Sequence, residues 1–231
     1  MKMIKDSARS ARQTDAPESL LCAASKLFAQ RGIDGVSTRE ITVAAGVNSA
    51  AIGYHFGTKE NLAREVFKSL AGPVNRTRLD ALTAYESSVG PKAKLDVAQI
   101  VRCFVEPALR AATDPTHESY HLGRLLLLLR TLSQPWVSEV SAEEFDVVFK
   151  RFVAAFQRAL PRLSHETLCW RYDLMVGMVL VATGYFDPTS RTSTRIVRVT
   201  DGLCVPTDTE KVIQQVVNFA IGAIQGPDTT S

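Results

Sequence analysis

Apolar residues recur at helical spacing along most of this 231-residue chain. The first such stripe consists of Leu20, Leu21, Ala24, Leu27 and Phe28. Pro17 precedes the stripe, where proline costs little because the first turn of a helix leaves its N–H groups unpaired. Gly32 follows it and can adopt the conformation that ends many helices. The pattern predicts a helix from about Pro17 to Gly32.

Two short helices are expected next. Ser37 or Thr38 can cap the first, because a hydroxyl accepts a hydrogen bond from the free N–H groups of a helix start. A tight turn at 45–47, which contains Gly46, separates it from a second short helix over about 48–57. The apolar residues expected to pack the core of this small unit are Ile41, Ala44, Val47, Ile52 and Phe56.

A longer helix should start at Thr58 and continue to Leu70. We expect Gly72-Pro73 to interrupt it, because proline lacks the donor that a helix interior needs, and the helix to resume over 75–86. Proline or glycine residues separate the remaining helical patterns. Further helices are predicted at 97–108, 122–132, 145–156, 164–185 and 209–224. Residues 187–208 are predicted to be non-helical, and 195–199 could form an extended ribbon. The fold class is therefore all-α.

Composition changes this picture little. The chain is 45% hydrophobic and 22% charged, with a formal net charge of +3, as expected for an ordinary globular protein. A mild positive charge permits nucleic-acid binding without requiring it. Cys22, Cys103, Cys169 and Cys204 are far apart, which favours reduced thiols in a cytoplasmic protein.

Neither a membrane span nor a secretory signal is predicted. The apolar run at 174–182 is too short, because a spanning helix needs about 20 residues. Residues 1–13 alternate Lys and Arg with small polar residues and lack an apolar core. We expect residues 1–16 to be a flexible basic arm.

Residues 32–62 carry the functional signal, because two short helices joined by a glycine-containing turn are typical of a helix-turn-helix. The second helix of this motif enters the major groove of DNA with its N-terminal residues at the base edges. The residues placed there are Asn48, Ser49, Ala50 and Ala51. The residues placed to contact phosphates on either side are Thr38, Tyr54, His55 and Lys59.

The same segment resembles the DNA-binding domain of the TetR/AcrR family. The resemblance lies in ASKLFAQRGIDGVSTREI (24–41), AAGV (44–47) and GYHFGTKENL (53–62). Gly53 departs from the family, which often has a bulky residue there. The layout after Pro73 has a fainter resemblance to regulators of the PsrA or CecR kind.

The resemblance implies a DNA-binding domain at 17–72 and a ligand-binding and dimerisation domain at 73–231. It implies a homodimer that binds double-stranded, palindromic operator DNA as a repressor and leaves it when a small apolar or amphipathic molecule binds. The last two long helices would form the dimer interface. No cofactor is expected. A helix-turn-helix that makes architectural or protein contacts remains an alternative.

The ligand pocket is predicted from apolar and polar residues of the larger domain. Its predicted lining is Phe104, His121, Arg124, Leu128, Phe152, Trp170, Arg171 and Met175. Leu122, Leu125 to Leu129, Phe149, Phe156, Met178, Arg130, Tyr172 and Tyr185 are further candidates. A buried arginine on the leucine-rich helix would need an acidic partner or an anionic ligand; a surface position is the alternative.

Residues 117–121, HESYH, match the zinc-protease pattern HExxH. On a helix the two histidines could hold zinc while Glu118 acts as a base. A catalytic zinc also needs a third protein ligand. One class of these enzymes has a histidine ligand at the position of Leu127, which cannot bind zinc; Glu139, Glu143 or Glu144 could supply the third ligand instead. A zinc-dependent hydrolase is thus an alternative, but we expect a polar helix start, no metal and no enzyme.

Overall fold

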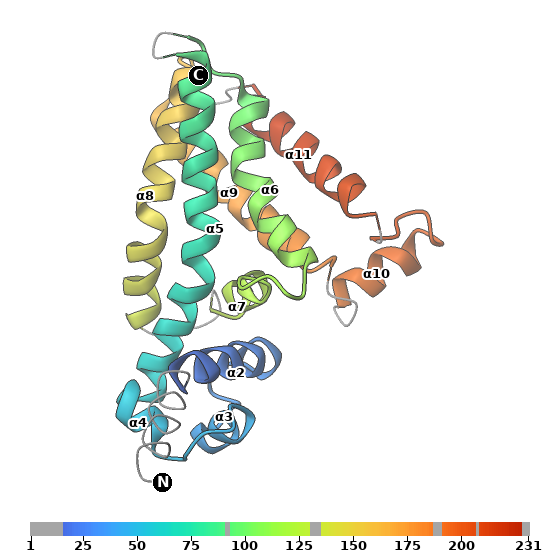
Figure 1. The fold of residues 1–231 in the computed structure, drawn as a ribbon. Coiled ribbons are helices and arrows are strands. Elements are labelled where there is room, and N and C mark those ends of the chain that lie inside the picture. Colours follow the sequence, from blue (N-terminus) through green and yellow to red (C-terminus); the bar gives the residue numbers. More distant parts are fainter. Residues whose placement is uncertain (1–15, 91–92, 130–134, 187–190, 207, 228–231) are drawn as a thin grey trace.

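A computed structural model describes residues 16–90, 93–129, 135–186, 191–206 and 208–227. All regular elements within these ranges are α-helices (Figure 1). They are α2 (Ala16–Arg31), α3 (Thr38–Ala44), α4 (Ala51–His55), α5 (Lys59–Val89), α6 (Val97–Thr113), α7 (Leu122–Leu129), α8 (Pro135–Ala159), α9 (His165–Thr183), α10 (Arg191–Val199) and α11 (Thr209–Gln225). The predicted all-α fold is confirmed. None of these described helices is long and apolar enough to cross a membrane.

The helices form a small and a large group that share α5. Helices α2, α3 and α4 gather at one end of the molecule, and α5 runs from them into the larger group (Figure 1). There it packs along α8 and α6, while α6 contacts α9 and α11. The predicted arm at 1–16 falls almost wholly on residues 1–15, outside the described part of the chain.

Helix α5 is continuous through Gly72-Pro73, so the predicted interruption there is wrong. Leu70, Ala71 and Val74 are all buried around the proline. Burial of this face against neighbouring helices outweighs the local cost of proline in a helix, which is about 3 kcal/mol. The expected domain boundary after residue 72 consequently lies inside one continuous helix.

Two apolar clusters organise the molecule. The first joins the small group to the start of α5, and it also includes Leu122, Leu125 and Leu129 of α7. The second fills the space between α6, α8, α9 and α11. Helix α7 therefore packs with the small group as well as against α9 of the larger one.

Helix α10 corrects a second prediction, because residues 191–199 are helical and 195–199 are not extended. The β-branched residues Ile196, Val197 and Val199 favoured a strand locally. A strand must pair its backbone with another strand, and the described part of the chain offers none. A helix satisfies the same backbone groups internally.

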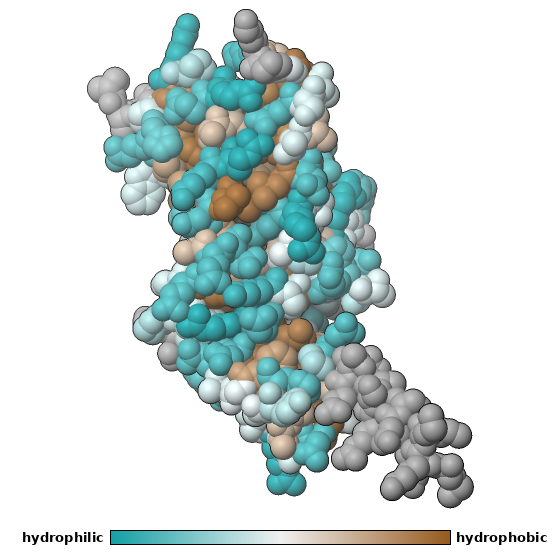
Figure 2. Space-filling view, turned by 60° about the vertical axis from the view of Figure 1, so that its left-hand side comes forward, coloured by the Kyte–Doolittle hydropathy of each residue, from teal (hydrophilic) through white to brown (hydrophobic). Residues whose placement is uncertain are grey.

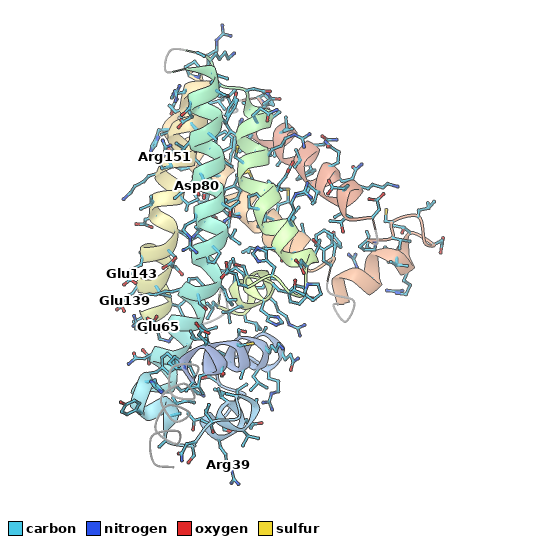
Figure 3. The ribbon with its side chains drawn as sticks, viewed as in Figure 1. Arg39, Glu65, Asp80, Glu139, Glu143 and Arg151 are labelled. Carbon is cyan, nitrogen blue, oxygen red and sulfur yellow. The ribbon has the colours of Figure 1, made fainter. Side chains whose placement is uncertain are left out.

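Ion pairs join α5 to α8 along one side of the molecule. Arg64 contacts Glu139 at 2.6 Å, and Lys68 contacts Glu143 at 2.9 Å. Figure 3 shows Glu139 and Glu143 on α8 beside α5, and Figure 2 shows that this side is mostly hydrophilic. Because both glutamates are exposed to solvent, these ion pairs add little to stability and mainly orient the two helices.

Lys59 at the start of α5 ties down the connection between α2 and α3. Its Nζ donates hydrogen bonds to the carbonyls of Ile33 at 3.0 Å and Val36 at 3.1 Å. The side chain is half-buried. Two of its three donors are therefore used within the protein, whatever the third contacts.

We predict that Lys59→Met lowers the free energy of unfolding by about 1–2 kcal/mol, because two half-buried carbonyls lose a charged donor. Urea unfolding followed by circular dichroism measures this change. Lys150→Met, at an exposed position of α8, is the control and should change stability by less than about 0.5 kcal/mol. Equal stability of the Lys59 variant and the wild type would contradict the structural role.

Candidate nucleic-acid interface and ligand cavity

A capping box fixes the start of α3. The Ser37 hydroxyl accepts a hydrogen bond from the Glu40 backbone N–H at 3.2 Å, and the Ser37 N–H donates to the Glu40 carboxylate at 2.8 Å. Arg31 adds a bond to the same carboxylate at 2.8 Å. The Ser37 donors, first the backbone N–H, and then Arg31 lower the pKa of Glu40 from 4.5 to about 2. Thr38 follows this cap and is exposed.

The turn between α3 and α4 has the predicted form. Gly46 has φ of +66°, a conformation that side chains disfavour. The Val47 N–H donates to the Thr42 carbonyl at 3.0 Å, which closes the turn. Thr42 itself is buried. The relative orientation of α3 and α4 is therefore set by backbone geometry rather than by exposed side chains.

The residues predicted to face bases lie at the exposed start of α4. Asn48, Ser49 and Ala50 precede the helix and are exposed, while Ala51 is half-buried. The Asn48 side-chain oxygen accepts a hydrogen bond from the Ala50 N–H at 2.8 Å, which orders this entry. Ile52, which is buried, anchors α4 to the small core.

Tyr54 and His55 are at the other end of α4. Tyr54 is 75% exposed, and His55 is half-buried with its ring 4.8 Å from that of Tyr54, edge to face. Gly53 is exposed, and a Cβ there would meet no atom within 4 Å. No steric contact within the chain therefore requires glycine at position 53, where the family often has a bulky residue. The absence of a side chain leaves the surface beside Tyr54 open.

Two details of this domain differ from expectation. Ala44 is exposed and does not belong to the core, whereas Val47 and Phe56 are half-buried and pack against the core as predicted. Arg39, an exposed cation on α3, was not among the predicted contacts, although it stands next to Thr38. Figure 3 shows its side chain projecting away from the protein at the end of the small group.

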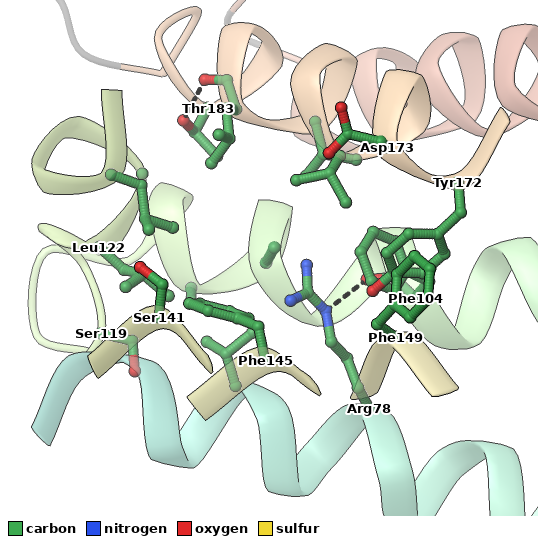
Figure 4. A pocket seen from close by; sticks show the side chains of 18 of the residues that line it. Arg78, Phe104, Ser119, Leu122, Ser141, Phe145, Phe149, Tyr172, Asp173 and Thr183 are labelled. Carbon is green, nitrogen blue, oxygen red and sulfur yellow. Dashed lines mark hydrogen bonds between the residues drawn. The ribbon is translucent and has the colours of Figure 1, made fainter. Parts of the chain in front are cut away.

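A cavity of about 430 Å³ lies between α5, α6, α7, α8 and α9 (Figure 4). Apolar side chains form most of its wall. They include Val74, Phe104, Ala108, Leu122, Leu126, Phe145, Phe149, Val176, Val179 and Leu180. The size and lining are typical of sites for small organic molecules.

Arg78 is the buried charge on this wall, with 6% of its surface exposed. Its Nε donates to the Phe104 carbonyl at 2.9 Å, and Nη1 donates to the Asn75 side chain at 3.2 Å. The guanidinium carbon lies 4.0 Å from the centre of the Phe104 ring. Burial lowers the pKa of Arg78 to about 10, which leaves it cationic at neutral pH.

The wall also carries the buried hydroxyl groups of Tyr172 and Ser119. Burial raises the pKa of the Tyr172 hydroxyl, so this group stays neutral. The Ser119 hydroxyl oxygen is fully buried and makes no hydrogen bond within the described residues. A buried hydroxyl without a partner costs free energy, which a bound polar atom would restore.

Only one of the eight residues predicted to line a ligand pocket, Phe104, lies on this cavity. Of the further candidates, Leu122, Leu126, Phe149 and Tyr172 also line it. Arg78 and Ser119 were missed. Arg78 could have been found, because Val74, Arg78 and Leu82 follow each other at intervals of four on the buried side of α5.

The other seven have different places in the fold. Phe152 and Met175 are buried in the core, and Trp170 is 64% exposed. Arg171 donates to the carbonyls of Ile224, Gly226 and Pro227 at 2.7–2.8 Å and so caps the end of α11. His121, Arg124 and Leu128 lie in or just before α7 but do not line the cavity. Arg130 lies outside the described residues.

The HExxH segment does not form the geometry of a zinc protease. Residues 114–121 form turns rather than a helix, so the two histidines do not share one helical face. The His117 Nδ1 instead accepts a hydrogen bond from the Ser119 N–H at 3.0 Å. Within the described ranges, no three His, Cys, Asp or Glu side chains are grouped so that they could hold a metal ion.

Helices α9 and α11 present an apolar face to solvent. Trp170 and Leu174 of α9 are 64% and 69% exposed, and Val181 continues the same stripe. Phe219 of the adjoining α11 is 68% exposed. Large exposed apolar side chains on neighbouring helices are characteristic of a surface that is covered by another molecule.

Sequence comparison assigns both parts of the chain to one family. Residues 20–66 match the model of bacterial regulatory proteins of the tetR family, and residues 102–223 match the tetracyclin repressor-like C-terminal domain. The HTH-type transcriptional repressor KstR2 of Rhodococcus jostii (strain RHA1) is 32% identical over 96 residues. That match covers 35% of this chain and 45% of KstR2, so it spans less than half of the relative.

Solved structures support the same fold. The TetR-family transcriptional regulator PfmR from Thermus thermophilus has a TM-score of 0.53 at 18% identity, over 90% of this chain and 98% of PfmR. A tetR-family bacterial regulatory protein from Rhodococcus RHA1 has a TM-score of 0.62 at 16% identity, over 92% and 98%. The C-terminal match extends over more than half of the chain and the N-terminal match covers the helix-turn-helix, so the chain belongs to the TetR family of bacterial transcriptional regulators.

Proposed function

We propose that this protein is a ligand-responsive repressor that binds operator DNA through α3 and α4. The observation that carries the proposal is the exposed entry to α4, where Asn48, Ser49 and Ala50 are held in order by a local hydrogen bond but contact no core. Small side chains let a helix approach base edges closely, and Asn and Ser can bond to them. KstR2, a repressor, supports the direction of regulation.

Phosphate contacts would come from both sides of α4. Thr38 and Arg39 stand at the start of α3, where free N–H groups and a cation attract anions. Tyr54 and His55 stand at the end of α4. Lys59 contributes its remaining donor and also supports the domain through its two carbonyl contacts.

We predict that Tyr54→Ala weakens operator binding at least fivefold, because it removes an exposed hydroxyl and ring without touching the core. Fluorescence anisotropy with DNA from upstream of the gene, and with genome-wide selected fragments, measures the affinity. Lys150→Ala on α8 is the control and should bind as the wild type does. Binding should also weaken steeply as salt rises, because released counterions drive phosphate contacts.

Absence of sequence-selective binding to any fragment, in folded protein, would overturn the DNA-binding proposal. An affinity for DNA that does not change with salt concentration would favour the alternative in which the helix-turn-helix contacts another protein.

The exposed face of α9 and α11 supports a homodimer. A two-fold axis through this face would bring the same two helices of each subunit together. Gly222 on α11 has open space around it, so a second helix can approach the backbone there. Such a dimer would present two copies of α4 to one side of the DNA, about 34–36 Å apart for successive major grooves.

We predict that Leu174→Glu converts the dimer to a monomer, because it places a charge in the centre of an apolar interface. Size-exclusion chromatography with light scattering measures the mass. Val147→Glu, at an exposed position of α8 outside this face, is the matched control and should stay dimeric. A Leu174 variant that remains dimeric would exclude this face as the interface.

The cavity and the DNA-binding end are joined through α7. Leu122 lines the cavity and also packs in the same cluster as Leu20 and Phe28 of α2. Gly123 lies directly against α9, since a Cβ there would come within 2.2 Å of the Thr183 hydroxyl. A ligand that displaces α7 would therefore shift α2 and with it the recognition helix, which is the proposed switch.

We predict that Gly123→Ala weakens operator binding in the absence of ligand at least fivefold, because the added methyl group forces α7 away from Thr183. Anisotropy and thermal unfolding measure affinity and stability in parallel. Leu127→Ala, on the exposed side of α7, is the control. Unchanged affinity in a variant that is folded would argue against α7 as the connection.

A further inference from the structure

Arg78 is a buried cation that has no counter-ion among the described residues. Within the described part of the chain, no aspartate or glutamate forms an ion pair with it. Its two hydrogen-bond acceptors are the Phe104 carbonyl and the Asn75 amide oxygen, which are dipoles and do not neutralise the charge. An uncompensated buried charge is costly, and a bound anion would offset this cost.

The guanidinium is directed into the cavity. Nε and Nη1 hold it in place from one side, while Nη2 makes no hydrogen bond with any described residue. Figure 4 shows the terminal nitrogens of Arg78 pointing into the space between α7, α8 and α9. The group is thus fixed by the protein and presents free donors to whatever fills the cavity, an arrangement that suits a carboxylate, whose two oxygens match the guanidinium fork.

The rest of the cavity limits the kind of anion. Its wall near Arg78 is formed by rings and aliphatic side chains such as Phe104, Phe149 and Val176, which favour an apolar body. Arg78 is the one cation among the described lining residues, so a second buried negative charge would have no partner. Asp146 and Asp173, which also line the cavity, are exposed and do not favour additional negative charge.

We propose that the effector is an amphipathic monocarboxylate, whose carboxylate pairs with the Arg78 guanidinium while its apolar body fills the cavity. This inference rests on the proposed ligand-responsive function and names the chemistry of its ligand. The unpaired Ser119 hydroxyl on the same wall offers a second polar contact to a ligand that carries an oxygen or nitrogen along its body.

Isothermal titration calorimetry on the full-length protein without DNA tests the proposal. The probes are decanoate and 2-naphthoate, each compared with its neutral amide, decanamide or 2-naphthamide. We expect at least one acid to bind at least tenfold more tightly than its amide. Binding of decanoate alone would indicate a chain-like body and binding of 2-naphthoate alone a flat ring; either result supports the proposal.

Arg78→Met should weaken acid binding at least tenfold and leave amide binding unchanged. The variant should remain folded, because an apolar side chain of similar length replaces a desolvated charge. Arg78→Lys keeps the charge without the fork and should bind the acid with intermediate affinity. Arg151→Met on α8, which breaks a surface contact to Glu86, is the control and should bind as the wild type does.

Three results would overturn the proposal: neither acid binds the folded wild type, the amides bind as tightly as the acids, or both Arg78 variants keep full affinity for the acid. The DNA assay separates these failures from those of the regulator itself. A protein that binds its operator but no acid remains a regulator with another ligand. One that binds acids through Arg78 but no DNA would keep the carboxylate site at Arg78 and lose the proposed function.

Discussion

The burial of one face of α5 from Leu62 to Leu82 is the constraint on which the rest of the molecule depends. Leu62, Val66 and Phe67 at its start complete the core of the DNA-binding end, and Leu82, nearer its other end, joins the core of the larger group. Because the packing is continuous, the helix tolerates Pro73. It also fixes where the small helical group lies relative to the larger one. The distance between recognition helix and cavity is therefore set by a single rigid element.

Helix α7 contacts both the cavity and the DNA-binding end. It is short, it packs in the cluster of the DNA-binding end, and it also forms part of the cavity wall. Its close approach to α9 depends on the absence of a side chain at Gly123. A ligand can change DNA affinity only by the difference between its own affinities for two conformations of the protein. In the proposed switch, the side chains that contact both the ligand and α7 would therefore contribute most to that difference.

The polar groups of the protein divide into those used by the fold and those left available. Ser37 and Glu40 are occupied with each other at the start of α3, and most of the Lys59 donors are used by carbonyls. Tyr54 and Arg39 are exposed, and the buried donors of Arg78 face a cavity. These donors, which the fold does not use, are the groups to which the proposed DNA and ligand contacts are assigned.

What the sequence determined by itself is local: a helix cap at Ser37 or Thr38, the turn at Gly46, the start of α4 and the positions of most helices. These features depend on neighbours within a few residues, so periodicity and turn chemistry are sufficient to predict them. The sequence also identified the helix-turn-helix, because its residues form one continuous segment.

Tertiary structure decided the rest. Packing from distant segments made α5 continuous through Pro73, turned residues 191–199 into a helix and brought Lys59 to two carbonyls. It also decided which buried residues border a cavity: Phe152 and Met175 are as apolar as Phe104, yet only Phe104 meets the empty space. Periodicity shows which side of a helix is buried. The position of a cavity depends on how helices that are far apart in the sequence cross one another, and the sequence pattern does not show this.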